Sequence, residues 1–293
     1  MSLLAENEFG QVNLVKLSQG LFSLVVEHSK ANGKVSLYGG QVLSWQPCGE
    51  REVFWLSKNS AFESGKAIRG GIPICWPWFG CHPKDIENIE GNHGFARGQV
   101  WEVDSIHISE QGVEICISWQ GENMSPLWPS SCQLQQVLFF GSTFKQSLQM
   151  KNLSKTDVYY TGALHSYFAV SSPEAIKIAE LEKAPFDDKL SKELCEPQSL
   201  DNGVGPIDRI YYTNNCMTIL DSEWQRSIEL KTKNTNQWVF WNPGVELANN
   251  MADIHRGGEK EFVCLEAANT QKQLLTAGGS VIIEQEIKVI SHK

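Results

Sequence analysis

The sequence has no long hydrophobic run and no leader-like beginning. No stretch of about eighteen apolar residues occurs in its 293 residues, which argues against a membrane-spanning helix. The first thirty residues lack a basic start, an apolar segment and a small-residue cleavage site, so we expect no secretory signal peptide. These absences predict a cytoplasmic protein with no membrane partner.

Paired cysteine motifs are also missing. None of the eight cysteines forms a CxxC pair, and a reducing compartment fits such unpaired thiols best. Cys75, Cys81 and His82 lie close together in the chain, but their spacing matches no common zinc pattern and a fourth ligand is not evident. We therefore expect no metal site.

A surplus of positive charge is absent as well. Lys and Arg number 25 against 34 Asp and Glu, which gives a formal net charge of −9. A broad basic surface for nucleic acid is excluded, and any anion site must be local. What the chain has in abundance is apolar material, 41% of its residues with 10 Trp and 13 Phe, enough for a large core.

Alternating apolar and polar residues predict an all-β fold. Residues 113–119 and 283–289 each place apolar side chains on one face and more polar ones on the other. Only residues 174–180 and 187–194 are compatible with a helical turn or two, and Pro185 interrupts any longer helix. Other strand-like runs cover residues 21–26, 35–37, 42–45, 136–140, 158–160, 210–212 and 238–241.

No internal repeat and no linker divides the chain. We therefore expect one large antiparallel β-sandwich domain over residues 1–293, with few short helices. Residues 65–98 depart from the strand pattern, because they are rich in Gly and Pro. A long irregular loop of this kind is usually functional.

Two arginines stand beside glycines in that loop. Arg69 precedes Gly70 and Gly71, and Arg97 precedes another glycine. A guanidinium offers a planar fork of donors to phosphate or carboxylate, and glycine lets a ligand approach the backbone closely. The alternative is that both arginines pair with carboxylates of the protein and that the glycines serve turns.

Three further residues carry candidate chemistry. His165 lies among apolar residues, which predicts a strand inside or beside the core, and Glu266 interrupts another apolar strand, where burial is costly without a partner. Together they form either an acid/base couple or a structural ion pair. Asp208 stands where a loop enters a strand and either binds a sugar hydroxyl or caps a turn.

Eight segments in order resemble the hexose-6-phosphate mutarotases, or glucose-6-phosphate 1-epimerases, of the galactose-mutarotase-like superfamily. The resemblance spans roughly residues 37–269 and implies a large antiparallel supersandwich with the sugar in an open cleft across one sheet. The segments are SLYGGQVLSWQP, AIRGGIPICWPWFG, NHGFARGQVW, ALHSYFAV, FDDKL, IDRIYY, WNPG and FVCLEAAN.

The resemblance also implies a mechanism without cofactor, metal or covalent intermediate. His165 would protonate the ring oxygen of the sugar, and Glu266 would remove the proton from the anomeric hydroxyl. The ring would open to an aldehyde, and reclosure after rotation about C1–C2 would give the other anomer.

The remaining residues implied by the resemblance bind substrate. Asp208 would hold sugar hydroxyls, Asn92 and His93 would line the cleft, and Arg69 and Arg97 would grip the phosphate of a small phosphorylated sugar. No nucleic-acid partner follows from it. The sequence does not define an oligomeric state, and a monomer is the simplest expectation.

Two other functions stay open at this point. An aldose 1-epimerase for unphosphorylated sugar would need the same couple of His165 and Glu266 without a phosphate clamp. A carbohydrate-binding regulator would keep the cleft without turnover. Glycoside hydrolysis fits less well, because it ordinarily uses two carboxylates around the scissile bond.

Overall fold

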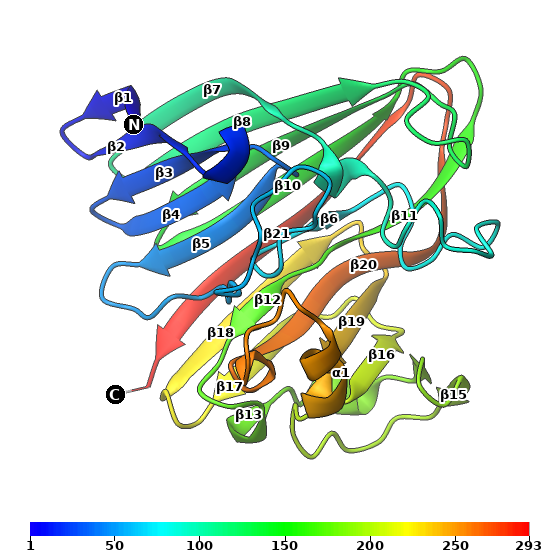
Figure 1. The fold of residues 1–293 in the computed structure, drawn as a ribbon. Coiled ribbons are helices and arrows are strands. Elements are labelled where there is room, and N and C mark those ends of the chain that lie inside the picture. The colour runs from blue at the N-terminus through cyan, green and yellow to red at the C-terminus, as the bar shows by residue number, and fades with distance from the viewer. Residues whose placement is uncertain (293) are drawn as a thin grey trace.

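The computed structural model describes residues 1–292, except for the side chain of Gln19, and it confirms an all-β fold of antiparallel strands (Figure 1). Residues 2–47 supply a five-stranded meander in sequence order. Its strands are β1 (Ser2–Asn7), β2 (Gly10–Lys16), β3 (Phe22–His28), β4 (Ala31–Ser36) and β5 (Gln41–Pro47).

An eight-stranded sheet lies behind this meander and extends beyond it (Figure 1). It packs on the meander through contacts such as the hydrogen bond from Trp45 Nε1 to the carbonyl of Gly141, 3.0 Å long. Its order is β13 (Ile176–Lys177), β17 (Met217–Asp221), β18 (Arg226–Lys233), β21 (Ser280–Ser291), β10 (Thr143–Asn152), β9 (Cys132–Gly141), β8 (Gly112–Gly121) and β7 (Glu102–Ser109).

A second eight-stranded sheet carries Glu266 and Asp208 in its strands, and His165 lies between two of them. β12 (Tyr167–Ala169) lies off the main path and pairs with β20. The order of the other strands is β15 (Glu193–Cys195), β14 (Phe186–Asp188), β16 (Ile207–Tyr211), β19 (Gln237–Asn242), β20 (Phe262–Leu275), β11 (Val158–Leu164) and β6 (Ile74–Cys75).

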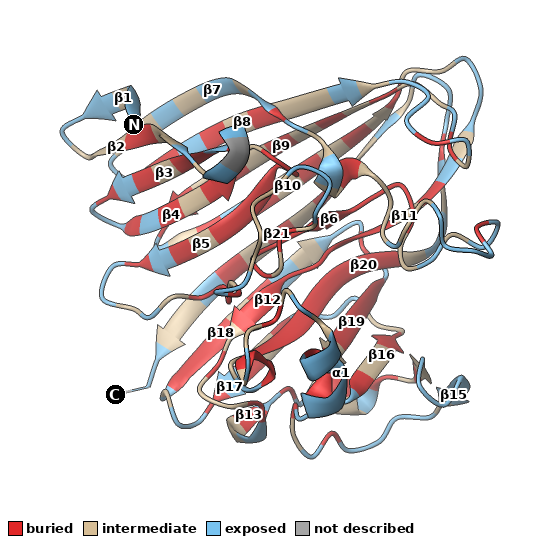
Figure 2. Ribbon diagram, viewed as in Figure 1, coloured by how far each residue is buried: buried red, intermediate tan, exposed pale blue. Residues whose placement is uncertain are grey.

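Burial follows the two-residue period of the strands (Figure 2). In β8, Val113, Ile115 and Ile117 are fully buried while Glu114 is exposed, as the alternation predicts. In β20 both faces are covered: residues 263, 265 and 267 join the main core, and residues 262, 264, 266 and 268 face the other side of the sheet. Glu266 is the charged member of that second set.

The predicted helical turns are corrected by the structure. Residues 187–194 form the β14–β15 hairpin, in which Asp187 pairs with Leu194, because the Asp188 carboxylate accepts the backbone N–H groups of Leu190 and Ser191 and closes a turn. Residues 174–180 contain part of a 3₁₀ turn (Pro173–Ala175) followed by β13. The α-helix α1 (Gly244–Asn250) has no counterpart among the sequence predictions.

The irregular segment 65–98 is confirmed, since it contains only β6 and a 3₁₀ turn (Ala96–Gly98) as regular structure. The main cluster of buried apolar side chains runs from Val12 to Ile287 and joins strands of all three sheets. This continuity supports our proposal of a single domain. No helix among residues 1–292 is long and apolar enough to cross a membrane.

A chain of buried glutamines crosses the core. Gln285 donates to Gln146 at 2.7 Å, Gln146 donates to Gln136 at 2.6 Å, and Gln136 donates to the carbonyl of Gly40 at 2.6 Å. All three glutamines are at most 1% exposed. The strands β9, β10 and β21 thus place three amides where each satisfies the next.

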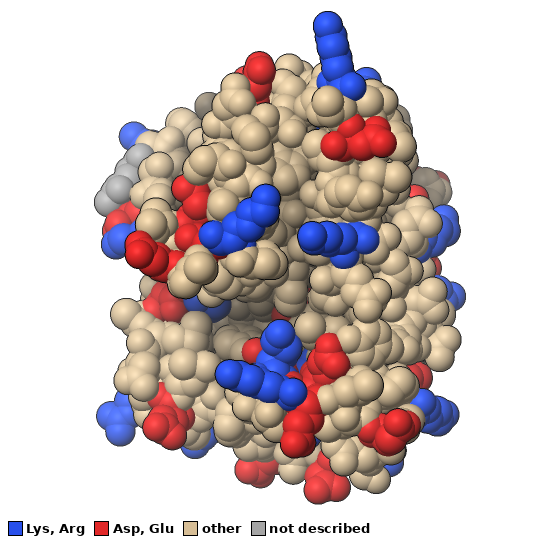
Figure 3. All heavy atoms as spheres, turned by 90° about the vertical axis from the view of Figure 1, so that its right-hand side faces the viewer, with Lys and Arg blue, Asp and Glu red and all other residues tan. Residues whose placement is uncertain are grey.

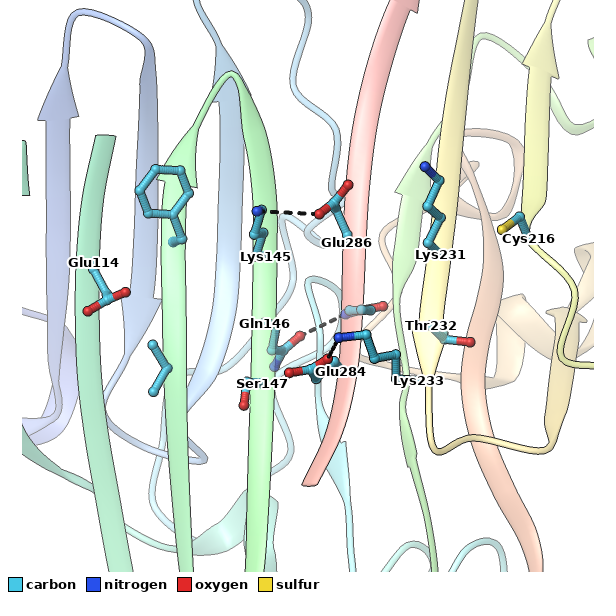
Figure 4. Close-up of a pocket in the computed structure, with 13 residues that line it drawn as sticks. Glu114, Lys145, Gln146, Ser147, Cys216, Lys231, Thr232, Lys233, Glu284 and Glu286 are labelled. Carbon is cyan, nitrogen blue, oxygen red and sulfur yellow. Dashed lines mark hydrogen bonds and ion pairs between the residues drawn. The ribbon is translucent and has the colours of Figure 1, made fainter. Parts of the chain in front are cut away.

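The opposite, solvent-facing side of this sheet carries charge pairs instead. Figure 4 shows Lys145 bonded to Glu286 and Lys233 bonded to Glu284, at 3.4 and 2.7 Å. A groove of about 680 Å³ lies over these strands. None of the seven predicted site residues lines it, so the groove is separate from the candidate active site.

The glutamine chain makes a testable contribution to stability. Replacing Gln146→Leu would leave the amides of Gln136 and Gln285 without their partner, so we expect the free energy of unfolding to fall by about 2 kcal/mol or more. The matched control is Gln149→Leu, which alters the half-exposed face of the same strand. Urea denaturation of both variants measures the difference, and equal stability would contradict the role of the chain.

Candidate active site

His165 sits at a break between two strands rather than within one. β11 ends at Leu164 and β12 begins at Tyr167, and the N–H of Ser166 turns back to the carbonyl of Leu164 at 3.0 Å. The predicted strand placement is therefore wrong by one residue, because this tight turn interrupts the ladder. The turn still leaves the side chain of His165 only 9% exposed.

Glu266 lies in the middle of β20, and its side chain is 2% exposed. Because β12 and β11 both pair with β20, the break that holds His165 falls beside this part of the strand. His165 Nε2 lies 3.3 Å from Glu266 Oε1. The two residues singled out in the sequence, about a hundred residues apart, are in contact.

Burial favours the uncharged forms of both His165 and Glu266. Desolvation holds the pKa of Glu266 well above its ordinary value, with a further contribution from the negative charge of Asp208. Desolvation also holds the pKa of His165 well below its ordinary value, and the proximity of His93, Arg69 and Arg97 adds to the effect. Although the 3.3 Å contact has ion-pair geometry, we expect it to be a hydrogen bond between a neutral imidazole and a carboxylic acid, because both groups are buried.

His165 and Glu266 each have one side-chain polar atom that does not take part in their contact. His165 Nδ1 and Glu266 Oε2 are both buried, and neither has a hydrogen-bond partner within residues 1–292. Buried polar atoms are normally paired, so these two unpaired atoms have hydrogen-bonding capacity left for a ligand. In the same described part of the chain, no group of three or more His, Cys, Asp or Glu side chains is arranged to hold a metal ion.

His93 packs edge-on against His165, with ring centroids 5.7 Å apart. Its Nδ1 accepts the N–H of Gly80 at 3.2 Å. Burial, assisted by the charges of Arg97 and Arg69, lowers the pKa of His93 to about 3. His93 is therefore an uncharged side chain that packs beside His165.

Arg69 is partly committed to protein partners. Its Nε and one terminal nitrogen contact Asp253 Oδ2 at 3.0 and 2.9 Å, and its other terminal nitrogen donates to the Tyr167 hydroxyl at 2.8 Å. The following glycines are required by the backbone: a Cβ at Gly70 or Gly71 would lie 2.4 or 2.1 Å from a carbonyl oxygen. The alternative of carboxylate pairing is thus correct for one edge of Arg69.

Arg97 differs from Arg69. It donates to the backbone carbonyl of Asn92 at 2.8 Å and forms no ion pair with a carboxylate of residues 1–292. The side chain of Asn92 itself is exposed. Figure 3 shows a hollow with Lys and Arg side chains around it on the side where β6, β11, β15 and β16 lie in Figure 1. A negatively charged ligand would be attracted to this side.

Asp208 and Trp241 lie beside the histidine–glutamate pair. Asp208 pairs with Trp241 between β16 and β19, and Trp241 pairs with Cys264 in β20, so their side chains share one face of the sheet. Burial raises the pKa of Asp208, while the charge of Lys189 opposes the rise. The rings of Trp241 and His165 meet nearly at right angles, 6.2 Å apart.

Three side chains at this site were not singled out from the sequence. Tyr167 and Trp241 fall inside segments that carried the resemblance, ALHSYFAV and WNPG, which was a usable signal. Asp253 follows α1 in a loop with no strand pattern, and nothing in the sequence links it to Arg69.

The all-β fold and the buried histidine–glutamate pair are what we expect of a sugar isomerase, and comparison with known proteins identifies the family. The aldose 1-epimerase family model matches residues 23–288, and the chain belongs to that family. It is 34% identical over 271 residues to the "Putative glucose-6-phosphate 1-epimerase" of Escherichia coli K12, covering 91% of this chain and 90% of that protein. The enzyme class predicted from the sequence is confirmed.

Solved structures agree. The crystal structure of a "putative mutarotase" from Salmonella typhimurium superposes with a TM-score of 0.89 at 30% identity, over 99% of this chain and 97% of that one. A galactose mutarotase-like protein from Clostridium acetobutylicum gives 0.77 at 14% identity over 97% and 100% of the two chains, which shows the fold alone. The galactose-mutarotase-like fold is confirmed, and the protein has the mutarotase activity of its family.

The raised pKa of Glu266 predicts a pH-dependent cost to stability. The folded protein holds this proton more tightly than the unfolded chain, so its contribution to stability is complete below about pH 4.5 and is lost as the pH rises toward the raised pKa. We expect Glu266→Gln to have a higher melting temperature than the wild type at pH 8, with a smaller difference at pH 5.

The control for this prediction is Glu114→Gln, because Glu114 is exposed on β8. Its melting temperature should follow that of the wild type at both pH values. A Glu266→Gln protein that is less stable than the wild type at pH 8 would show that the carboxylate is stabilised in the fold.

Proposed function

We propose that this protein interconverts the α and β anomers of D-glucose 6-phosphate, and of other aldohexose 6-phosphates, with His165 and Glu266 as the proton carriers. The observation that carries the proposal is the 3.3 Å contact between these two buried side chains. The ring oxygen and the anomeric hydroxyl of a sugar are attached to the same carbon, so an acid and a base that serve both must be neighbours.

The pair carries the number of protons that the reaction needs. A neutral histidine with a protonated glutamate and an imidazolium with a carboxylate each hold one transferable proton between them. Ring opening gives one proton to the ring oxygen and takes one from the anomeric hydroxyl. Rotation about C1–C2 and reclosure with reversed roles return the pair to its starting state.

Binding of a phosphate would itself move the proton toward His165. The positive charges of Arg69 and Arg97 lower the pKa of His165 in the free protein. A dianionic phosphate on these arginines neutralises that effect, so the imidazolium becomes easier to form once a phosphorylated sugar is bound. This produces the arrangement that the resemblance implies, with His165 as the acid and Glu266 as the base.

The two arginines contribute differently to phosphate binding. Arg97 has no carboxylate partner among the described residues, so the donors not used by its bond to the Asn92 carbonyl can bind the phosphate. Arg69 is held by Asp253 and Tyr167 and presents only the donors that remain. The name of the Escherichia coli relative, a glucose-6-phosphate 1-epimerase, supports a phosphorylated substrate.

Other residues complete the proposed site. Asp208 would accept hydrogen bonds from sugar hydroxyls, since its carboxylate shares the cleft face with Trp241. His93 would close the wall next to His165, and Asn92 would act through its carbonyl on Arg97.

Exchange NMR of sugar anomers tests the proton carriers. We expect His165→Ala and Glu266→Ala each to reduce the enzymatic exchange of glucose 6-phosphate anomers at least about 100-fold, because each removes one half of the acid/base couple. His107 and Glu114 provide a matched control, since they form an exposed cross-strand pair between β7 and β8. After subtraction of spontaneous mutarotation, wild-type exchange in either active-site variant would refute the mechanism.

Selectivity for phosphate is tested at Arg97. We expect Arg97→Ala to raise the KM for glucose 6-phosphate about tenfold or more, because a charge-assisted hydrogen bond is lost, and to leave exchange of free glucose nearly unchanged. Arg51→Ala is the control, since Arg51 is exposed and stacks on Trp224. If the preference for phosphorylated sugar survives both Arg97→Ala and Arg69→Ala, the phosphate clamp lies elsewhere.

A further inference from the structure

The imidazole of His165 lacks a common means of orientation. In many enzymes the second ring nitrogen of a catalytic histidine bonds to a carboxylate or carbonyl, which fixes the ring and its tautomer. Here Nε2 faces Glu266, while Nδ1 is buried without a partner in residues 1–292. Apart from the contact of Nε2 with Glu266, packing therefore orients the ring.

Tyr167 supplies that packing. Its ring lies parallel to the imidazole, with 4.8 Å between centroids and an interplanar angle of 7°. The other two aromatic neighbours of His165, His93 and Trp241, meet it edge-on at 76° and 78°. Tyr167 is thus the aromatic side chain that covers a face of the imidazole, two residues further along the chain.

Tyr167 is itself held in a stack of rings. It stacks on Trp55 at 5.9 Å and 24°, and Trp55 stacks on His255 at 5.7 Å and 23°. We call His165, Tyr167, Trp55 and His255 the ring stack. Its far end is anchored by Glu261, whose Oε2 contacts Trp55 Nε1 at 2.9 Å and His255 Nε2 at 3.0 Å.

The hydroxyl of Tyr167 has a second connection. It accepts a hydrogen bond from Arg69 at 2.8 Å, and Asp253 holds the opposite edge of the same guanidinium. Tyr167 is 1% exposed, so neither contact competes with bulk water. One buried side chain therefore touches both a proposed proton carrier and a proposed phosphate ligand.

We propose that Tyr167 is a positioning residue with two separable actions, an inference that rests on the proposed roles of His165 and Arg69. Its ring orients the imidazole of His165 and stabilises the imidazolium that forms during ring opening, since a cation over an aromatic face is attracted to it. Its hydroxyl orients the guanidinium of Arg69 toward the anionic group of the substrate.

Two substitutions separate the actions. Tyr167→Phe keeps the ring and removes the hydroxyl, so we expect the KM for glucose 6-phosphate to rise about three- to tenfold while kcat stays within about twofold. Tyr167→Leu removes the ring as well, so we expect kcat to fall about 10- to 100-fold, because misorientation of a catalytic group is costly. Tyr167→Phe should thus keep the kcat that Tyr167→Leu loses, because phenylalanine retains the aromatic ring.

Tyr160 provides matched controls. It is 3% exposed in β11 and packs in the main core, where it contacts neither site arginine through any hydrogen bond of the described residues. Tyr160→Phe and Tyr160→Leu should lower the melting temperature without separating KM from kcat. A purely structural role of Tyr167 would give the same pattern at both positions.

Anomer-exchange NMR over a range of glucose 6-phosphate concentrations gives kcat and KM for all variants. A wild-type kcat in Tyr167→Leu, or equal kcat losses in Tyr167→Phe and Tyr167→Leu, would overturn the ring's role. An unchanged KM in Tyr167→Phe would overturn the hydroxyl's role. If Tyr167→Leu does not fold, Tyr167→Met replaces it as the variant without the ring, with the same two deciding outcomes.

The His165→Ala protein, measured alongside, separates a failure of the proposed function from a failure of the inference about Tyr167. If His165→Ala retains full exchange, the proposed function fails and the role of Tyr167 fails with it. If His165→Ala is inactive while both Tyr167 variants match the wild type, the proposed function stands and the inference about Tyr167 is wrong.

Discussion

The contact between His165 Nε2 and Glu266 Oε1 is the interaction on which the functional account depends. It exists because β11 and β12 pair with the same strand, β20, and leave a two-residue break opposite Glu266. The burial that comes with this position raises the pKa of Glu266 and lowers that of His165, so it favours the neutral form of each group. A pair that shares one proton is suited to a reaction in which a proton is given and another is taken at a single carbon.

We propose that the positive charges around this pair do more than bind a ligand. Arg69 and Arg97 act on buried His165 electrostatically, so a bound phosphate would change the protonation balance of the site as well as the position of the sugar. Arg69 is anchored through Asp253 and Tyr167, whereas Arg97 is tied to the protein by a backbone carbonyl. In our proposal, Arg97 binds the phosphate, and Arg69, which is held in place by the protein, fixes the position of the phosphate.

Much of the fold could be predicted from residue patterns. Alternation in residues 113–119 and 283–289 identified β8 and β21, because one face of each strand is buried and the other meets solvent. The hairpin at 187–194 was missed, because its turn depends on side-chain acceptance by Asp188 rather than on apolar periodicity. The interruption at His165 has no local signal either, since its neighbours on both sides are strand formers.

Part of the site could be predicted as well. Glu266 was conspicuous because an acidic residue in an apolar strand is expensive to bury, and the motif around His165 supplied its partner. The contact of Arg69 with Asp253, 184 residues away, and the stacking of Tyr167 on His165 depend on tertiary packing, and no spacing rule gives them. Sequence thus indicated the chemistry, while the structure shows how the groups are held.

The most direct test of the central claim is a crystal structure of the Glu266→Gln protein with glucose 6-phosphate bound. We expect the ring oxygen and the anomeric oxygen to lie within hydrogen-bond distance of residues 165 and 266, with the phosphate on Arg97. A sugar bound with its anomeric carbon directed away from both residues, or bound in the groove on the outer sheet, would contradict the account.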